Sequence, residues 1–162
     1  ERELRHGGAS LAPGTTPPCR RGAPRVSGTP PPRHSLGDSL AALVAVRAAG
    51  LEPVPHIAAR RIPSGATARL FLEEAVRRAG VSKVLLLGGD DPQPRGPYPD
   101  GASLLRDGVL AGSGVREVAL PGYPEGHPVI SRDVLERALM EKLELASTQG
   151  LGAYLEIGRA HV

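Results

Sequence analysis

The segment Val84-Leu-Leu-Leu-Gly-Gly-Asp-Asp-Pro92 indicates the fold class of this chain of 162 residues. Its apolar run has the length of a strand and no polar interruption, which is typical of a strand buried on both faces of a parallel sheet. The run passes directly into two glycines and two aspartates, so polar groups follow the carboxyl end of the strand. In α/β proteins, ligands bind at that edge of the sheet.

Short apolar runs and helical patterns alternate on both sides of this strand. We expect helices over residues 38–50, 66–79, 101–110 and 132–147, and further strands over residues 53–57 and 115–120 and from residue 153 onward. Asp38 is the expected cap of the first helix, and Gly80 the expected end of the second. This order predicts right-handed βαβ units and a parallel sheet, which a doubly wound fold and a (β/α)8 barrel both provide.

Helical periodicity predicts which side chains face the core. They are Leu40, Leu43, Val44 and Ala48 in the first helix, Leu70, Phe71, Ala75 and Val76 in the second, and Val134, Leu135, Ala138, Leu139 and Leu143 in the last.

The overall composition favours a soluble protein of the cytoplasm. Hydrophobic residues make up 40% of the chain, and no apolar stretch has the length of a membrane span or the form of a signal peptide. The single cysteine, Cys19, excludes an internal disulfide and fits a reducing compartment.

The first 36 residues differ from the rest of the chain. They carry six arginines, two glutamates and seven of the 17 prolines, whereas the remaining residues have a net charge of −1. We expect this head to be disordered or erroneous sequence, because it lacks the apolar periodicity of a folded segment. The folded part, residues 37–155, shows no cluster of cations, so we expect no nucleic-acid partner.

A second polar loop, Gly122-Tyr-Pro-Glu-Gly-His-Pro128, follows the expected strand over residues 115–120. Proline and glycine restrict and shape its backbone. Such a loop at the end of a strand suits ligand binding. The alternative is a proline-rich turn whose polar groups are only solvated.

The remaining polar candidates also have structural alternatives. His56 is either a ligand donor or a core histidine bonded to a carbonyl. Asp91 suits a turn before proline, and the pair Asp90 and Asp91 lacks further ligands at the spacing of a metal site, so we expect no metal. Lys142 is either a ligand contact or a solvated, ion-paired lysine. Neither a phosphate-binding glycine motif nor the serine elbow of hydrolases is present.

Four segments together resemble the methylenetetrahydrofolate reductase family. They are Pro53-Val-Pro-His-Ile-Ala-Ala-Arg60, Val84-Leu-Leu-Leu-Gly-Gly-Asp90, Gly101-Ala-Ser-Leu-Leu105, and the stretch from Val118 through Tyr123-Pro-Glu-Gly-His-Pro128. The resemblance covers about residues 38–155, and the Tyr-Pro-Glu-x-His-Pro piece is its most specific part. It implies a fragment of a (β/α)8 TIM barrel that holds FAD at the carboxyl ends of its strands. The implied enzyme reduces 5,10-methylenetetrahydrofolate to 5-methyltetrahydrofolate, and NAD(P)H reduces the flavin first.

The resemblance also implies roles for individual residues. Residues in contact with FAD would be His56, Gly89, Asp90, Ala102, Tyr123, His127 and Lys142, the last near the flavin phosphates after one gap in the match. Asp90 would be catalytic, because a carboxylate beside the flavin ring and the folate stabilises positive charge on the substrate and disfavours negative charge on the reduced flavin.

Several parts of the family's pattern are missing. Gly88 stands where some members have arginine, and neither the first-strand glutamate that acts as general acid nor a Thr-Gln pair after Tyr154 is found. The family's second strand should fall near residues 24–29, where proline and arginine dominate. Residues 156–162, Glu-Ile-Gly-Arg-Ala-His-Val, match the translation of a sequencing adapter, so we expect the natural sequence of this chain to end near Leu155.

We therefore expect the full-length parent to be the enzyme and these 162 residues alone to lack turnover. Two alternatives remain. One is a barrel relative that binds folate without flavin redox chemistry, and the other is a non-catalytic interaction module. The sequence leaves open whether NADH or NADPH is the reductant, and whether the protein is a monomer or a homo-oligomer.

Overall fold

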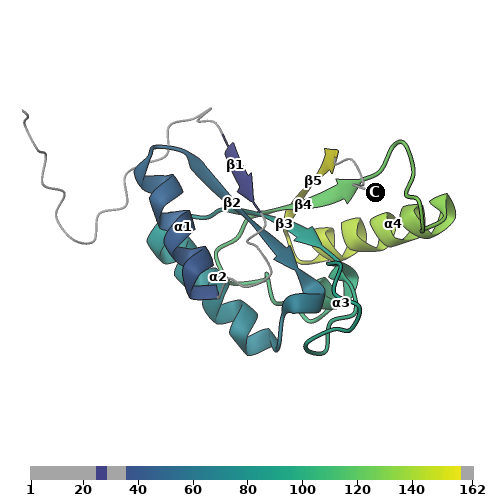
Figure 1. Cartoon of the computed structure of the whole chain (residues 1–162), viewed down its shortest axis with the longest axis horizontal. Coiled ribbons are helices and arrows are strands. Elements are labelled where there is room, and N and C mark those ends of the chain that lie inside the picture. Colours follow the sequence, from purple (N-terminus) through teal and green to yellow (C-terminus); the bar gives the residue numbers. More distant parts are fainter. Residues whose placement is uncertain (1–24, 29–35, 158–162) are drawn as a thin grey trace, which may run out of the picture.

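Five strands alternate with four α-helices in the part of the chain that the computed structural model describes, residues 25–28 and 36–157 (Figure 1). In chain order the elements are β1 Arg25–Gly28, α1 Leu36–Ala48, β2 Glu52–Ala58, the short 3-10 helix η1 Ala59–Arg61, α2 Gly65–Ala79, β3 Lys83–Leu87, α3 Gly101–Arg106, β4 Glu117–Gly122, α4 Arg132–Thr148 and β5 Gly152–Ile157. The predicted alternation of strands and helices is confirmed.

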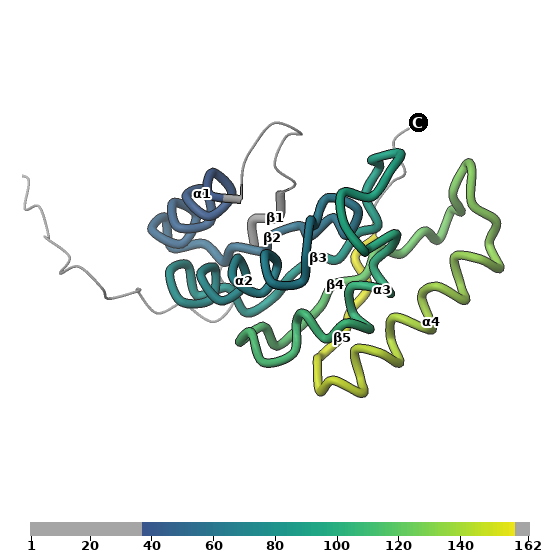
Figure 2. Tube along the Cα trace, turned by 90° about the horizontal axis from the view of Figure 1, so that it is seen from below, coloured from purple at the N-terminus to yellow at the C-terminus, as the bar shows by residue number. Residues whose placement is uncertain are grey.

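The strands form a single parallel sheet in the order β1-β2-β3-β4-β5. Right-handed crossovers between consecutive neighbours place successive helices on the same face of the sheet. Figure 1 shows the four helices gathered on one side of the strands, and Figure 2 shows them following one another across the molecule. In a doubly wound sheet the strand order reverses at one point, and these five strands contain no such reversal. Strands that neighbour one another in sequence order are also found in a (β/α)8 barrel.

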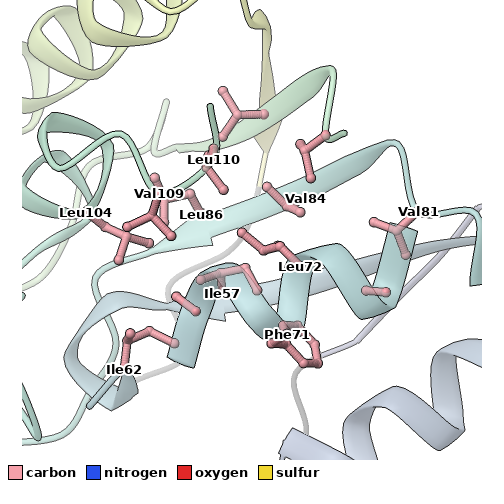
Figure 3. Close-up of a cluster of buried hydrophobic side chains, with 14 of the residues drawn as sticks. Ile57, Ile62, Phe71, Leu72, Val81, Val84, Leu86, Leu104, Val109 and Leu110 are labelled. Atoms are coloured by element: carbon pink, nitrogen blue, oxygen red, sulfur yellow. The ribbon is translucent and has the colours of Figure 1, made fainter. Parts of the chain in front are cut away.

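The core lies between the helices and one face of the sheet (Figure 3). The register pairs Val84 with Val118, so their side chains share this face, and both are fully buried. Leu72 of α2 and Leu104 of α3 pack into the same cluster. Burying an aliphatic side chain of this size contributes about 1.5–3 kcal/mol, so this layer holds the helices on the sheet.

The opposite face of the sheet is also buried at its centre. Leu85 is 5% exposed and its register partner Ala119 is fully buried, while His56 lies beside Leu85 on the neighbouring strand. At the amino end of the sheet, the Lys83 ammonium lies 3.6 Å from a Glu52 carboxylate oxygen and 3.3 Å from one of Glu117. The prediction that the apolar run of β3 is buried on both faces is confirmed.

The bounds of three elements differ from the sequence prediction by more than one residue at an end. The α1 helix begins at Leu36, so Asp38 lies in its first turn and is not its cap; a carboxylate there still suits the helix dipole. The α3 helix ends at Arg106 because Gly108 adopts a left-handed φ of 64° shortly afterwards. The β4 strand pairs from Glu117 to Gly122 and so extends beyond the predicted end.

Three predicted core positions are wrong. Leu70 is 63% exposed, because the inner face of α2 is formed by residues such as Phe71 and Leu72 on the other side of the helix. Val134 is 44% exposed on the outer side of α4. Ala48 is exposed, and its neighbour Arg47 turns inward, where its guanidinium donates to the carbonyls of Ala79 (2.8 Å) and Gly80 (2.8 Å) at the end of α2.

The terminal segments are described only in part. The β1 strand falls within the first 36 residues, near the place where the resemblance puts a strand, and pairs in parallel with β2. Glu156 and Ile157 pair with Pro121 and Gly122. Predictions about Cys19 and the rest of residues 1–24, 29–35 and 158–162 lie outside the described residues. Within the described ranges, no helix has both the length and the apolar character needed to cross a membrane.

Candidate functional site

The polar candidates lie where β2, β3 and β4 end. These strands are parallel neighbours, so their carboxyl ends form one edge of the sheet. His56 stands near the end of β2, and two loops follow at the same edge. We call residues 88–100 the β3–α3 loop and residues 123–131 the β4–α4 loop. The candidates for ligand binding therefore share one edge, as the sequence predicted for parallel strands.

His56 is half-buried on the face of the sheet opposite the helices. Burial lowers the pKa of its imidazole, and the negative charge of Glu156 opposes this shift to a smaller extent. A lowered pKa keeps the ring neutral at physiological pH. A neutral imidazole can both donate and accept a hydrogen bond, which suits a polar atom of an uncharged ligand group.

Gly89 in the β3–α3 loop has a left-handed φ of 96°. A Cβ atom at this position would lie 3.2 Å from the Cβ of Ala58 and 3.6 Å from that of Arg60. Both the backbone conformation and the tight packing against the end of β2 therefore favour glycine. The resemblance makes Gly89 a contact of FAD, and the structure adds that the loop itself lies close to β2 at this position.

The two adjacent aspartates of this loop have different surroundings. The carboxylate of Asp91 lies 3.2 Å from Nε of Arg61 and 3.6 Å from Nε of Arg95. Asp90 is exposed at the edge of the sheet. Asp91 thus serves to hold the loop, while the side chain of Asp90 remains accessible to a ligand.

The β4–α4 loop is organised by its own residues. The amide of Gly126 donates to the carbonyl of Tyr123 (2.9 Å), which closes a turn with Pro124 in its second position. The rings of Tyr123 and His127 meet edge to face, with centroids 5.4 Å apart and planes at 84°. The Nδ1 atom of His127 accepts from the amides of Val129 (3.2 Å) and Ile130 (3.3 Å).

This last contact determines the tautomer of the ring. Because Nδ1 of His127 is an acceptor, a neutral imidazole carries its proton on Nε2. The Nε2–H group is then the donor available to a ligand. The exposed Glu125 lies between the two rings in sequence but has no share in their contact.

Two further candidates lie at the start of α3. Ala102 is 6% exposed in the first turn of this helix. Lys142 of α4 packs nearby, since a Cβ atom at Gly101 would lie 3.7 Å from its Cδ. Burial lowers the pKa of Lys142, while Asp100 and Glu141 raise it. The lysine is therefore half-buried beside the helix, unlike the fully solvated lysine of the alternative interpretation.

The sequence did not indicate a role for Arg60, which is the last residue of the segment Pro53-Val-Pro-His-Ile-Ala-Ala-Arg60. In the structure, the guanidinium of Arg60 binds the carbonyls of Asp91, Pro92 and Pro99. The signal was indirect: the β3–α3 loop contains four prolines, which supply carbonyls but no amide donors. Such a loop needs donors from elsewhere in the chain.

The described part of the chain contains no group of three or more histidine, cysteine, aspartate or glutamate side chains that could hold a metal ion. The arrangement is one of hydrogen-bonding rings and an exposed carboxylate along one edge of a parallel sheet, with a half-buried cation beside the start of α3. No protein-family model matches the sequence.

Proposed function

We propose that this chain is part of a flavin-dependent reductase that transfers hydride from NAD(P)H through FAD to 5,10-methylenetetrahydrofolate. The observation that carries the proposal is the shared edge of β2, β3 and β4, along which His56, Asp90, Tyr123 and His127 lie. These are the positions to which the resemblance assigns the flavin and the reacting carbon. The same resemblance makes the sheet a portion of a (β/α)8 barrel, and the consecutive order of the five parallel strands supports this.

The side chains present are suited to a flavin dinucleotide. The neutral ring of His56 and the Nε2–H of His127 provide hydrogen bonds for the polar atoms of a ring system. Lys142 provides a positive charge for a phosphate, and its partial burial strengthens that interaction. When bound, FAD would supply the hydride transfer itself.

Asp90 is the residue that would act on the reaction. Its exposed carboxylate lies one residue from Asp91, whose charge is balanced by Arg61 and Arg95. A free negative charge beside the folate stabilises positive charge that develops on the substrate during transfer. The carboxylate therefore favours departure of hydride toward the folate.

Flavin binding by the purified chain tests the proposal. We expect FAD fluorescence to be quenched in a saturable manner. The variant His127→Ala should weaken binding about tenfold, because it removes the Nε2 donor and the ring against Tyr123. The matched control is Glu125→Gln, an exposed residue of the same loop, which should bind FAD like the unchanged chain. Circular dichroism verifies that each variant is folded.

The outcomes separate the alternatives. Saturable binding that His127→Ala weakens and Glu125→Gln leaves unchanged supports a flavoprotein. Binding of folate without FAD would favour a folate-binding relative without redox chemistry, and binding of neither would favour an interaction module. We expect no folate reduction by these 162 residues alone, because the general-acid glutamate and the Thr-Gln pair are missing from the sequence. Measurable turnover by the purified chain would refute that expectation.

A further inference from the structure

The backbone of Arg60 contacts the β3–α3 loop at its first residue and near its middle. Its amide donates to the carbonyl of Gly88 (3.0 Å), and its carbonyl accepts from the amide of Arg95 (2.8 Å). These bonds attach the loop to η1, which directly follows β2. Gly96 packs on the same segment, since a Cβ atom there would overlap the carbonyl oxygens of Ile62 and Pro63.

The guanidinium of Arg60 then spans the loop. Its Nε donates to the carbonyl of Asp91 (2.6 Å), its Nη2 to that of Pro92 (2.7 Å) and its Nη1 to that of Pro99 (3.1 Å). One planar group with donors in fixed directions thus joins residues from the start and the end of the loop. Hydrogen bonds from a charged donor are stronger than those between neutral groups.

The guanidinium of Arg60 influences how Asp90 and Asp91 are oriented. The Arg60 side chain binds the peptide carbonyl of Asp91, while Arg61 and Arg95 flank the carboxylate of that residue. The peptide between Asp91 and Pro92 therefore has a defined orientation, and Asp90 is the neighbouring residue that is exposed at the edge of the sheet.

We infer that Arg60 is a positioning residue that sets the β3–α3 loop and thereby presents Asp90 to the substrate. The assignment of Asp90 to a reaction rests on the proposed function, whereas the conformation of the loop does not. Lysine cannot replace Arg60, because the three N–H donors of an ammonium share one nitrogen, whereas Arg60 reaches the three carbonyls from three separate nitrogens held in one plane. The geometry of the fork, and not the positive charge alone, carries the effect.

Amide hydrogen exchange tests the loop without any ligand. In the purified chain we expect Arg60→Lys and Arg60→Gln to accelerate exchange of peptides from residues 88–100 by about tenfold or more, with α4 unchanged. The matched control is Arg77→Lys on α2, whose exposed guanidinium binds only Glu74 among the described residues and should leave the loop as it is. Unchanged exchange in Arg60→Lys would overturn the inference.

The reduction potential of bound FAD tests whether Arg60 acts through Asp90. Removing a nearby negative charge eases formation of a negatively charged reduced flavin, so Asp90→Asn should raise the potential. Arg60→Lys should also raise it, but the rise should vanish when Asp90→Asn is already present. If Arg60→Lys raised the potential equally with and without Asp90→Asn, Arg60 would not act through Asp90, and that part of the inference would be overturned. If the unchanged chain binds no FAD, the proposed function fails, and the exchange data still decide whether Arg60 sets the loop.

Discussion

The loops after β3 and β4 lie at the same edge of the sheet, yet they are held by different kinds of contact. The β3–α3 loop depends on Arg60 and Arg61, which precede their partner in it by about thirty residues and lie in η1, directly after β2. The β4–α4 loop depends on bonds among its own residues, from Tyr123 to Ile130. The first conformation thus requires the assembled sheet, whereas the second is encoded locally.

This difference predicts how each loop responds to substitution. Changes that disturb the contact between β2 and β3 should affect the first loop strongly and the second weakly. Changes within residues 123–130 should affect only the second loop, because its contacts span few residues. The following variants test this contrast, in order of decreasing expected effect.

The largest effect is expected for Gly96→Ala. The new Cβ would overlap backbone carbonyls of Ile62 and Pro63, which cannot rotate away, so the loop must separate from η1. We expect the free energy of unfolding to fall by about 3 kcal/mol. The control Gly126→Ala has open space and strains only a backbone with φ of 89°, at about 1 kcal/mol. Urea unfolding measures both, and equal losses would contradict the contrast.

The next effect concerns the tyrosines of the two loops. Tyr98 is 3% exposed and its hydroxyl donates to the carboxylate of Asp107. Replacing Tyr98 with phenylalanine should lower the free energy of unfolding by about 1–2 kcal/mol. Tyr123→Phe should change it by less than about 0.5 kcal/mol, because Tyr123 acts through its ring. A larger loss from Tyr123→Phe than from Tyr98→Phe would reverse the comparison.

Tyr98 also predicts a dependence on alkaline pH. Burial, followed by the contact with Asp107, raises the pKa of Tyr98 from 10.0 to about 12. The unfolded chain therefore loses this proton at lower pH than the folded chain. The stabilisation is complete below pH 10.0 and is lost as the pH rises toward about 12. Urea unfolding across this range should show a decline that Tyr98→Phe reduces and Tyr123→Phe preserves.

A smaller, local effect is expected at His127. Asparagine places an acceptor near the position of Nδ1, so His127→Asn should keep the amides of Val129 and Ile130 protected from hydrogen exchange. His127→Phe keeps the ring against Tyr123 but has no acceptor, so exchange of these amides should accelerate about tenfold. The β3–α3 loop should be unaffected by either variant. Faster exchange there would show that the loops are coupled.

The smallest effect is expected for Asp91→Asn. This change removes the ion pairs with Arg61 and Arg95 but leaves the carbonyl of Asp91 bound to Arg60. Partly exposed pairs contribute little, so we expect a loss below about 1 kcal/mol that shrinks further at high salt. Urea unfolding at two salt concentrations measures it. A loss comparable to that of Gly96→Ala would mean that charge, and not backbone contact, holds the loop.

Much of the fold was predictable because short-range patterns specify it. The apolar run of β3 predicted burial on both faces, and Gly80 predicted the end of α2, where it adopts a left-handed φ of 60°. Leu70 and Arg47 were not predictable in this way. The exposure of Leu70 depends on which side of α2 meets its neighbours, and the burial of Arg47 depends on the carbonyls left at the end of α2. Periodicity finds a helix but leaves such contacts undetermined.

At the candidate site, the strands, the polar groups that follow them and the compact loop of Tyr123 and His127 could be predicted from the sequence. Glycine, proline and neighbouring side chains are sufficient there, because the interacting atoms are close along the chain. The tertiary structure alone decided which of two adjacent aspartates is tied and which is exposed. That choice follows from Arg61, which pairs with the Asp91 carboxylate, and from Arg60, which binds the Asp91 carbonyl; both reach the loop only when β2 and β3 lie side by side. A contact between distant residues exists only after the sheet has brought them together.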